Sequence, residues 1–133
     1  MCAAAVADLR PARPVARKLK KGADDAALAT LELVENPDVL ATLGRAKAPG
    51  QVVVGFAAET DDVVANAERK LAAKGADLMV ANDVSEGRAF GRDENEATLV
   101  SATGAEPLPS MAKRALADAI LDRAAAALGA SSC

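Results

Sequence analysis

Polar side chains follow two apolar segments between Gly55 and Ser85, and a helical segment separates them. The pattern is an apolar strand, a helix with an apolar stripe, and a second apolar strand. In an open α/β sheet, ligands bind outside the carboxyl ends of the strands. We therefore expect a site formed by the side chains at these two ends, namely Glu59, Thr60, Asn82, Asp83 and Ser85.

Lys70 and Lys74 lie at the edge of the apolar stripe of this helix, four residues apart, where like charges repel. An anion between them would remove the repulsion, as at a phosphate-binding site. Two alternatives stay open. Lysines in the last turn of a helix interact favourably with its dipole, and their long side chains often extend past apolar surface to reach water.

Composition restricts the chemistry that this chain can carry. It has 133 residues, 51% of them hydrophobic, which is enough for one domain with a buried core. It has no His, Tyr or Trp, which excludes serine–histidine triads, imidazole metal sites and most aromatic platforms for single-stranded nucleic acid. Cys2 and Cys133 lie at opposite ends without a CxxC spacing, so we expect reduced thiols. Because no segment has the pattern of a signal peptide or a membrane span, we expect a cytoplasmic protein without a membrane partner. The net charge of −3 and the 2% of aromatic residues make a nucleic-acid partner unexpected as well.

Positive charge is concentrated near the start of the chain. Residues 1–21 contain six basic side chains and one acidic side chain, whereas the whole chain has a net charge of −3. A basic stretch on an acidic chain indicates a local anion-binding segment. A solvated loop and a nucleic-acid contact are the alternatives. The basic residues are Arg10, Arg13, Arg17, Lys18, Lys20 and Lys21.

The segment order predicts a single α/β domain over residues 1–133, with a Rossmann-like, mostly parallel sheet flanked by helices and a C-terminal β-hairpin. Strands are expected at residues 3–7, 28–34, 52–56 and 77–80, and the hairpin at residues 97–108. Helices are expected at residues 36–44, 61–74 and 110–128, the first with Asn36 as its N-cap. The long loop at residues 9–27 carries the basic cluster and is expected to be either a functional lid or a disordered segment.

Several motifs follow one another in a recognisable order: AAAVADLRP, KLKK, ENPDVL, VVVGFAAET, KLAAKGADLMVANDVS and FGRDENEATLV. In this order they resemble the synthetase domain of bacterial bifunctional phosphopantothenoylcysteine synthetase/decarboxylase, from Met1 into the last predicted helix. The resemblance implies the C-terminal portion of a phosphopantothenate–cysteine ligase of coenzyme A biosynthesis. Such a ligase activates 4′-phosphopantothenate with CTP and Mg²⁺ to an acyl-cytidylate and then couples it to cysteine.

The resemblance also implies roles for individual residues. Lys18 would stabilise the reacting phosphates from a lid that excludes water. The triphosphate of CTP would be the anion between the two lysines of the central helix. No metal ligands are implied. The polar turn at residues 91–96 also matches the family, and we expect it to serve turn formation, with substrate contact as the open alternative. The implied CTP contacts are Cys2, Ala3, Ala4, Asp8, Lys18, Pro37, Asp38, Val39, Leu40, Phe56, Lys70 and Lys74.

The family's synthetase domain has a further amino-terminal portion, and its decarboxylase domain is separate; neither is expected in this chain. We therefore expect marginal stability of the monomer, or association with a second copy or with the missing portion. The alternative function is a noncatalytic nucleotide-binding or assembly fragment.

Overall fold

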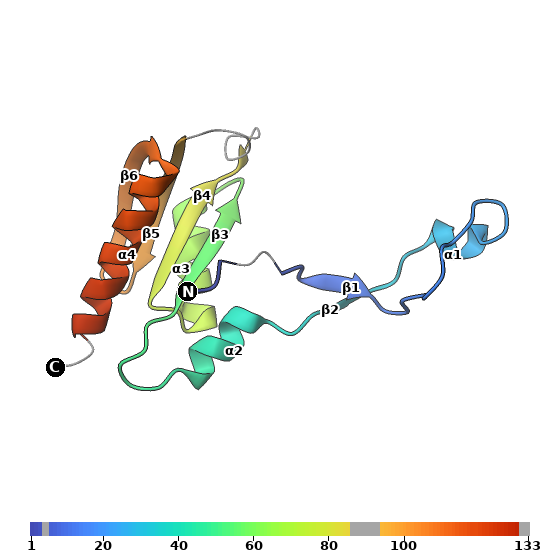
Figure 1. The fold of residues 1–133 in the computed structure, drawn as a ribbon, viewed down its shortest axis with the longest axis horizontal. Coiled ribbons are helices and arrows are strands. Elements are labelled where there is room, and N and C mark those ends of the chain that lie inside the picture. The colour runs from blue at the N-terminus through green and yellow to red at the C-terminus, as the bar shows by residue number, and fades with distance from the viewer. Residues whose placement is uncertain (4–5, 86–93, 131–133) are drawn as a thin grey trace. The chain divides into compact units, whose positions relative to one another are not determined.

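The computed structural model describes residues 1–3, 6–85 and 94–130, and the chain divides by its contacts into two compact units (Figure 1). Unit 1 comprises residues 1–3 and 39–133, and unit 2 comprises residues 4–38. The single domain expected from the sequence stays a prediction, because a division by contacts does not define domains. None of the helices in the described ranges is both long enough and apolar enough to cross a membrane.

Unit 1 contains a four-stranded sheet in the order β3-β4-β5-β6. Strands β3 (Val54–Glu59) and β4 (Leu78–Asp83) are parallel and are connected by helix α3 (Val63–Lys74). Strands β5 (Glu94–Ser101) and β6 (Gly104–Ala112) form an antiparallel hairpin that pairs with β4. The prediction of an α/β fold with a C-terminal hairpin is confirmed, and parallel pairing in the described sheet is confined to β3 with β4.

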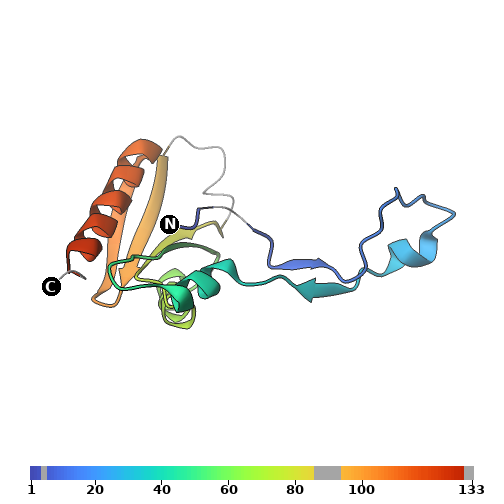
Figure 2. The same ribbon diagram turned by 60° about the horizontal axis from the view of Figure 1, so that its bottom comes forward.

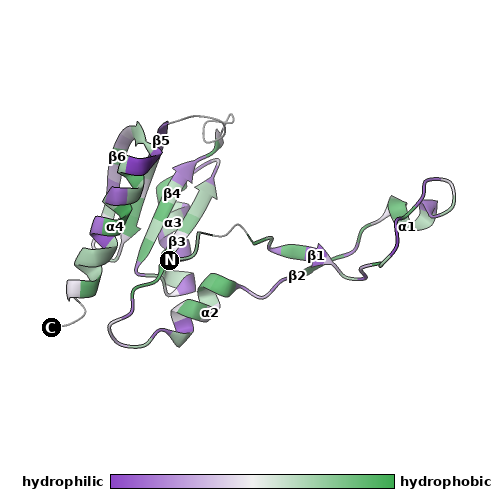
Figure 3. Cartoon of the chain, in the orientation of Figure 1, coloured by the Kyte–Doolittle hydropathy of each residue, from purple (hydrophilic) through white to green (hydrophobic). Residues whose placement is uncertain are grey.

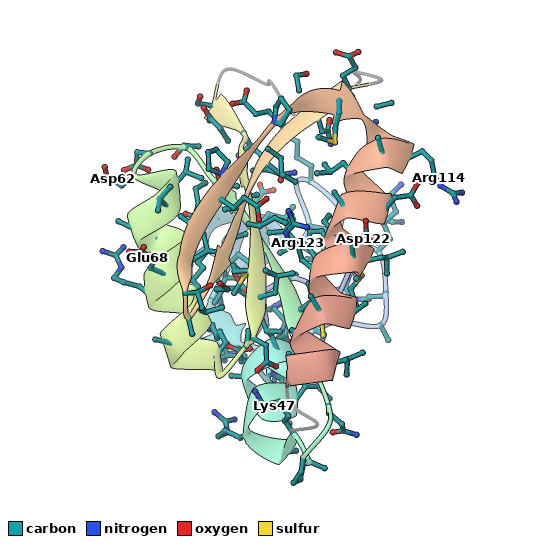
Figure 4. The ribbon with its side chains drawn as sticks, turned by 90° about the vertical axis from the view of Figure 1, so that its left-hand side faces the viewer. Lys47, Asp62, Glu68, Arg114, Asp122 and Arg123 are labelled. Carbon is teal, nitrogen blue, oxygen red and sulfur yellow. The ribbon has the colours of Figure 1, made fainter. Side chains whose placement is uncertain are left out.

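Helices α3 and α4 (Lys113–Ala130) cover opposite faces of this sheet (Figure 4). Successive residues of an extended strand point to opposite faces. Accordingly, Leu78 and Val80 of β4 pack in the cluster on the α4 side, and Met79 and Ala81 pack in the cluster on the α3 side. Both clusters are made of aliphatic side chains and methionine, so the core fixes the strands without polar groups.

Helix α2 (Val39–Ala46) approaches the C-terminal end of α3 through Gly44. A Cβ atom on Gly44 would lie 1.9 Å from the backbone oxygen of Lys74, so only glycine permits this contact. The sequence prediction ended this helix at Gly44, which is too early, because the glycine allows close packing and does not terminate the helix. Gly75 ends α3 instead, in the left-handed conformation, and its N–H donates to the Ala72 oxygen at 3.3 Å.

Unit 2 contains a two-stranded antiparallel ribbon (Figure 2). Strand β1 (Leu9–Pro11) pairs with β2 (Leu33–Glu35), and the short helix α1 (Asp25–Ala29) lies between them in the chain. The N–H of Ala12 donates to the Glu32 oxygen at 2.9 Å, which extends the ribbon by one more pair. No described residue of unit 2 is buried, so hydrogen bonds and ion pairs determine its conformation rather than a core.

The sequence predictions were less accurate in unit 2. The described residues of the segment 3–7 form no strand, the expected loop at 9–27 contains β1, and the expected strand at 28–34 is divided between α1 and β2. Helix α2 begins at Val39 and not directly after Asn36. The Asn36 side chain makes other contacts: it donates to the Ala7 oxygen at 2.7 Å and accepts from Arg10 at 3.0 Å.

Candidate anion-binding site

The carboxyl ends of β3 and β4 meet at one edge of the sheet, where Glu59 pairs in register with Asp83. Figure 3 shows hydrophilic colour at the end of β4 after a hydrophobic strand. The oxygens at this edge are acceptors: Asp83 accepts the Ser85 N–H at 2.8 Å, and the buried Oδ1 of Asn82 has no hydrogen-bond partner among the described residues. An edge rich in acceptors repels an anion. The strand ends therefore come together as predicted, but they do not form an anion site by themselves.

Lys70 has its counter-ion within the chain. Its Nζ lies 2.6 Å from Oε1 of Glu59, whose side chain is 12% exposed, although this contact is an ion pair without hydrogen-bond geometry. Lys74 also interacts with another part of the chain. The repulsion that called for an external anion is thus offset internally at Lys70, and the assignment of both lysines to a ligand stays a prediction.

The other predicted contacts in unit 1 have mixed surroundings. Phe56 of β3 is 43% exposed, so it is not a core residue. Leu40 packs against the cluster on the α3 side, while Val39, at the first position of α2, is exposed. The backbone N–H of Cys2 donates to the Val54 oxygen at 2.9 Å, which places the start of the chain beside β3. Ala3 belongs to the same unit.

The remaining predicted contacts belong to unit 2 or lie outside the described residues. Asp8 accepts the Asn36 N–H through its backbone oxygen at 2.8 Å, next to the ribbon. Pro37 and Asp38 end the unit, and Asp38 interacts within the chain. Ala4 lies outside the described residues, as do residues 91–93 of the polar turn, whereas residues 94–96 begin β5. The predicted site residues are thus distributed over both units.

Each arginine of unit 2 binds a partner within the unit. Arg10 donates to the backbone oxygen of Glu35 at 2.8 Å, and Arg13 forms an ion pair with Glu32 at 2.8 Å. Arg17 contacts both carboxylate oxygens of Asp24, at 2.9 and 2.5 Å. The hydrogen bonds between Arg17 and Asp24 raise the pKa of the arginine and lower the pKa of the aspartate. The planar guanidinium is suited to such paired contacts.

The lysines of unit 2 differ from its arginines. Lys18, Lys20 and Lys21 are all exposed, and none of their ammonium groups forms an ion pair with a carboxylate in the part of the chain that the structure describes. We name residues 17–21 the basic tip. Its lysines are the cations of this unit that are available to an external anion.

Two further groups were not identified from the sequence. One is Asp24, whose sequence context shows only an acidic pair before a short helix. The other is the contact of Asp77 with Lys47 at 2.6 Å and with the Val53 N–H at 2.7 Å, at the end of the sheet opposite the strand ends described above. The local sequence could have indicated neither. Asp24 lies 7 residues from Arg17, and Asp77 lies 30 residues from Lys47 and 24 residues from Val53.

Comparison with known proteins places this fold in a family. The profile of the DNA/pantothenate metabolism flavoprotein C-terminal domain matches residues 1–128. The chain belongs to this family. A similar protein in Mycolicibacterium smegmatis, the coenzyme A biosynthesis bifunctional protein CoaBC, is 48% identical over 136 residues, which cover 95% of this chain and 32% of that protein. The protein of the same name in Vibrio vulnificus is 44% identical and has a similar coverage of 95% and 31%. The chain spans about a third of the length of these relatives.

Two solved structures resemble the fold. The crystal structure of the C-terminal domain of CoaBC has a TM-score of 0.65 and 34% identity, and covers 90% of this chain and 49% of that one. The DNA/pantothenate metabolism flavoprotein from Streptococcus pneumoniae has a TM-score of 0.59 over 73% of this chain and 42% of that one. At 23% identity, the second structure supports the fold alone.

These findings contradict the function assigned from the sequence. The matched family is described as the C-terminal domain of a flavoprotein and not as a CTP-dependent synthetase, and none of the names above is that of a ligase. The ligase reaction, CTP, Mg²⁺ and the coupling to cysteine were implied by the synthetase resemblance, so they are withdrawn with it. The noncatalytic nucleotide-binding or assembly fragment is not supported either. Coenzyme A biosynthesis agrees with the names of the relatives.

The family description raises the question of whether a flavin fits this chain. A flavin requires an apolar slot for its ring with polar groups at the ring edge. Among the described residues, Phe56 is the sole aromatic side chain and no buried residue is polar or charged. At the strand ends, the Glu59 carboxylate is already paired with Lys70. The described residues therefore do not fit a flavin, and the chemistry of a flavin supplies no step here.

Proposed function

We propose that this chain is part of a cytoplasmic protein of coenzyme A biosynthesis, and that it binds the phosphate group of a phosphorylated coenzyme A precursor with the basic tip of unit 2. The names of the relatives support the metabolic context. The phosphate contact is proposed from the charges of this chain itself. Lys18 is the proposed principal contact, with Lys20 and Lys21 beside it.

The proposal rests on the different contacts of the arginines and the lysines in unit 2. All three arginines bind carboxylates, an amide or backbone oxygens of the same unit, whereas the three lysines pair with no described carboxylate. A lysine ammonium is a compact charge that binds phosphate as a point charge. The unit thus uses its arginines to define its conformation and leaves its lysines for a ligand.

The sheet edge supports the same proposal by contrast. Glu59 and Asp83 are neighbours there, and Lys70 already neutralises Glu59. A phosphate at this edge would have to compete with a carboxylate for the ammonium group, and it would meet a second carboxylate nearby. Lysines without carboxylate partners avoid this competition, so the basic tip is the more favourable place for a phosphate group.

The test is isothermal titration calorimetry with 4′-phosphopantothenate, and with pantothenate as the ligand without phosphate. We expect saturable binding of the phosphorylated compound and weaker binding of pantothenate. Lys18→Ala should weaken the binding of 4′-phosphopantothenate about tenfold, which corresponds to about 1.4 kcal/mol. Lys113→Ala is the matched control, because Lys113 is an exposed lysine at the start of α4 in unit 1.

The comparison of the two variants decides the proposal. Loss of affinity in Lys18→Ala with no change in Lys113→Ala supports a contact at the basic tip. Equal affinity of the unmodified chain for 4′-phosphopantothenate and pantothenate would refute a phosphate site. An equal effect of the two substitutions would also refute it, because it would indicate a response to net charge alone.

We also propose that the chain associates with other parts of the longer protein to which its relatives correspond. Large apolar side chains of unit 2 are exposed, and the unit has no core that could cover them. Such exposure supports a contact surface. The residues are Val6, Leu9, Val15, Leu28, Leu31, Leu33 and Val34.

A further inference from the structure

The conformation of the basic tip depends on one carboxylate, that of Asp24. Its two oxygens accept from Nη1 and Nη2 of Arg17, at 2.9 and 2.5 Å. Oδ2 also accepts the backbone N–H of Lys20 at 2.9 Å, and the N–H of Asp24 donates to the Lys20 oxygen at 2.9 Å. The Asp24 side chain is 12% exposed, whereas that of Arg17 is 66% exposed. Asp24 thus lies at the inside of a closed loop.

The same loop keeps the nearby acidic groups away from the lysines. The Asp24 carboxylate accepts hydrogen bonds from Arg17 and from the backbone N–H of Lys20, and Asp25 accepts the N–H of Gly22 at 2.6 Å. Gly22 has a φ of +88°, which a glycine adopts without strain and which turns the chain back toward α1. Both carboxylates that follow the basic tip in sequence are therefore occupied by groups other than ammonium.

We propose that Asp24 is a positioning residue, which holds residues 17–24 in a closed loop by binding Arg17 and the Lys20 backbone, and thereby presents Lys18 to a phosphate group. This inference rests on the proposed function. Asp24 itself does not contact the ligand. It acts through the loop, since a segment that is ordered before binding loses less conformational entropy when the ligand binds.

Charge alone predicts the opposite result from positioning. Removing the carboxylate of Asp24 makes the basic tip more positive by one charge, which would strengthen phosphate binding by simple electrostatics. If Asp24 positions the loop, its removal weakens binding despite the extra positive charge. The sign of the change in affinity therefore separates the two effects.

The experiment compares Asp24→Ala, Asp24→Asn and Asp118→Ala in the 133-residue chain, with calorimetry of 4′-phosphopantothenate and of pantothenate. We expect Asp24→Ala to weaken the binding of 4′-phosphopantothenate about tenfold and to leave pantothenate unchanged. Asp24→Asn keeps an acceptor for the Lys20 N–H but loses the ionic contact with Arg17. Its affinity for 4′-phosphopantothenate should therefore lie between those of the unmodified chain and Asp24→Ala. Asp118→Ala is the control, because Asp118 forms an exposed ion pair with Arg114 on α4.

Limited digestion with trypsin supplies a second measurement that does not depend on the ligand. Trypsin cleaves after lysine and arginine, so an opened loop should be cut faster within residues 17–21. We expect faster cleavage there in Asp24→Ala, with unchanged cleavage in α3 and α4. Unchanged cleavage at the basic tip would overturn the inference even if the affinity fell.

The outcomes also separate this inference from the proposed function. If Lys18→Ala weakens binding and Asp24→Ala leaves it equal or tighter, the phosphate site stands and the positioning role is refuted. If neither substitution changes the affinity, the proposed phosphate site itself is refuted. If both weaken it and the loop of Asp24→Ala is cleaved faster, both are supported.

Discussion

Replacing Gly44 by alanine tests the packing of α2 on α3, because the two effects of this substitution oppose each other. Alanine favours a helix over glycine by about 1 kcal/mol. The new Cβ atom, however, would lie 1.9 Å from the Lys74 oxygen and 3.0 Å from the Gly75 oxygen. An ordinary contact begins at 3.4 Å, so the helices would have to separate by about 1.5 Å at this point.

Such overpacking costs about 1–3 kcal/mol, and a clash with backbone atoms belongs at the upper end of this range. After subtraction of the gain in helix propensity, we expect Gly44→Ala to lower the free energy of unfolding by about 2 kcal/mol. The assay is equilibrium unfolding in urea, followed by circular dichroism. The midpoint should fall while the slope of the transition stays the same.

Gly129→Ala is the control for this experiment. Gly129 lies near the end of α4, and a Cβ atom there would meet no atom within 4 Å. Only the propensity effect then applies, and we expect a neutral result or a gain of up to about 1 kcal/mol. If Gly44→Ala were as stable as Gly129→Ala, the close approach of α2 to α3 would be wrong.

Two further predictions concern ionic contacts in unit 1. Asp77→Ala removes the partner of Lys47 and leaves the Val53 N–H unpaired beside a buried strand. We expect it to lower the free energy of unfolding, measured by urea unfolding, by about 2–4 kcal/mol. Hydrogen bonds from Arg123 of α4 lower the pKa of Glu106. The stabilisation from this pair is therefore present above the ordinary glutamate pKa and is lost as the pH falls through the lowered pKa. In urea unfolding across the acidic range, Glu106→Gln should therefore lose less stability on acidification than the unmodified chain, and an identical pH profile would contradict the effect of this pair.

Sequence patterns succeeded where burial determines structure. The expected helix at 61–74 agrees closely with α3, because its apolar stripe and the following Gly75 are local signals of a packed helix and its end. The hairpin around Thr103-Gly104 was also predicted, and Gly104 has the positive φ that a tight turn requires. Both elements contribute buried residues to the core, Ala67 from α3 and Ala97, Leu99, Val100 and Leu108 from the hairpin.

The same patterns failed in unit 2, which has no described buried residue. Hydrophobic periodicity reports which side of an element faces a core, so it has no meaning in a ribbon without one. Arg10 and Glu35 are joined across 25 residues, and nothing in the local sequence indicates that pairing. The helix start was misplaced as well, and the oxygen of Asn36, the expected N-cap, accepts a long-range hydrogen bond from Arg10.

The resemblance assigned both Lys18 and Lys70 to the phosphates of a nucleotide, and the structure gives these two lysines different surroundings. Lys70 lies 2.6 Å from a carboxylate that is only 12% exposed, so any anion must displace Glu59 or accept its repulsion. Lys18 lies in a loop whose carboxylate is bound to Arg17. An attraction between charges is strongest where no charge already present offsets it. A net charge of −3 is therefore compatible with the proposed phosphate contact, provided that the binding lysines are those that the described carboxylates leave unpaired.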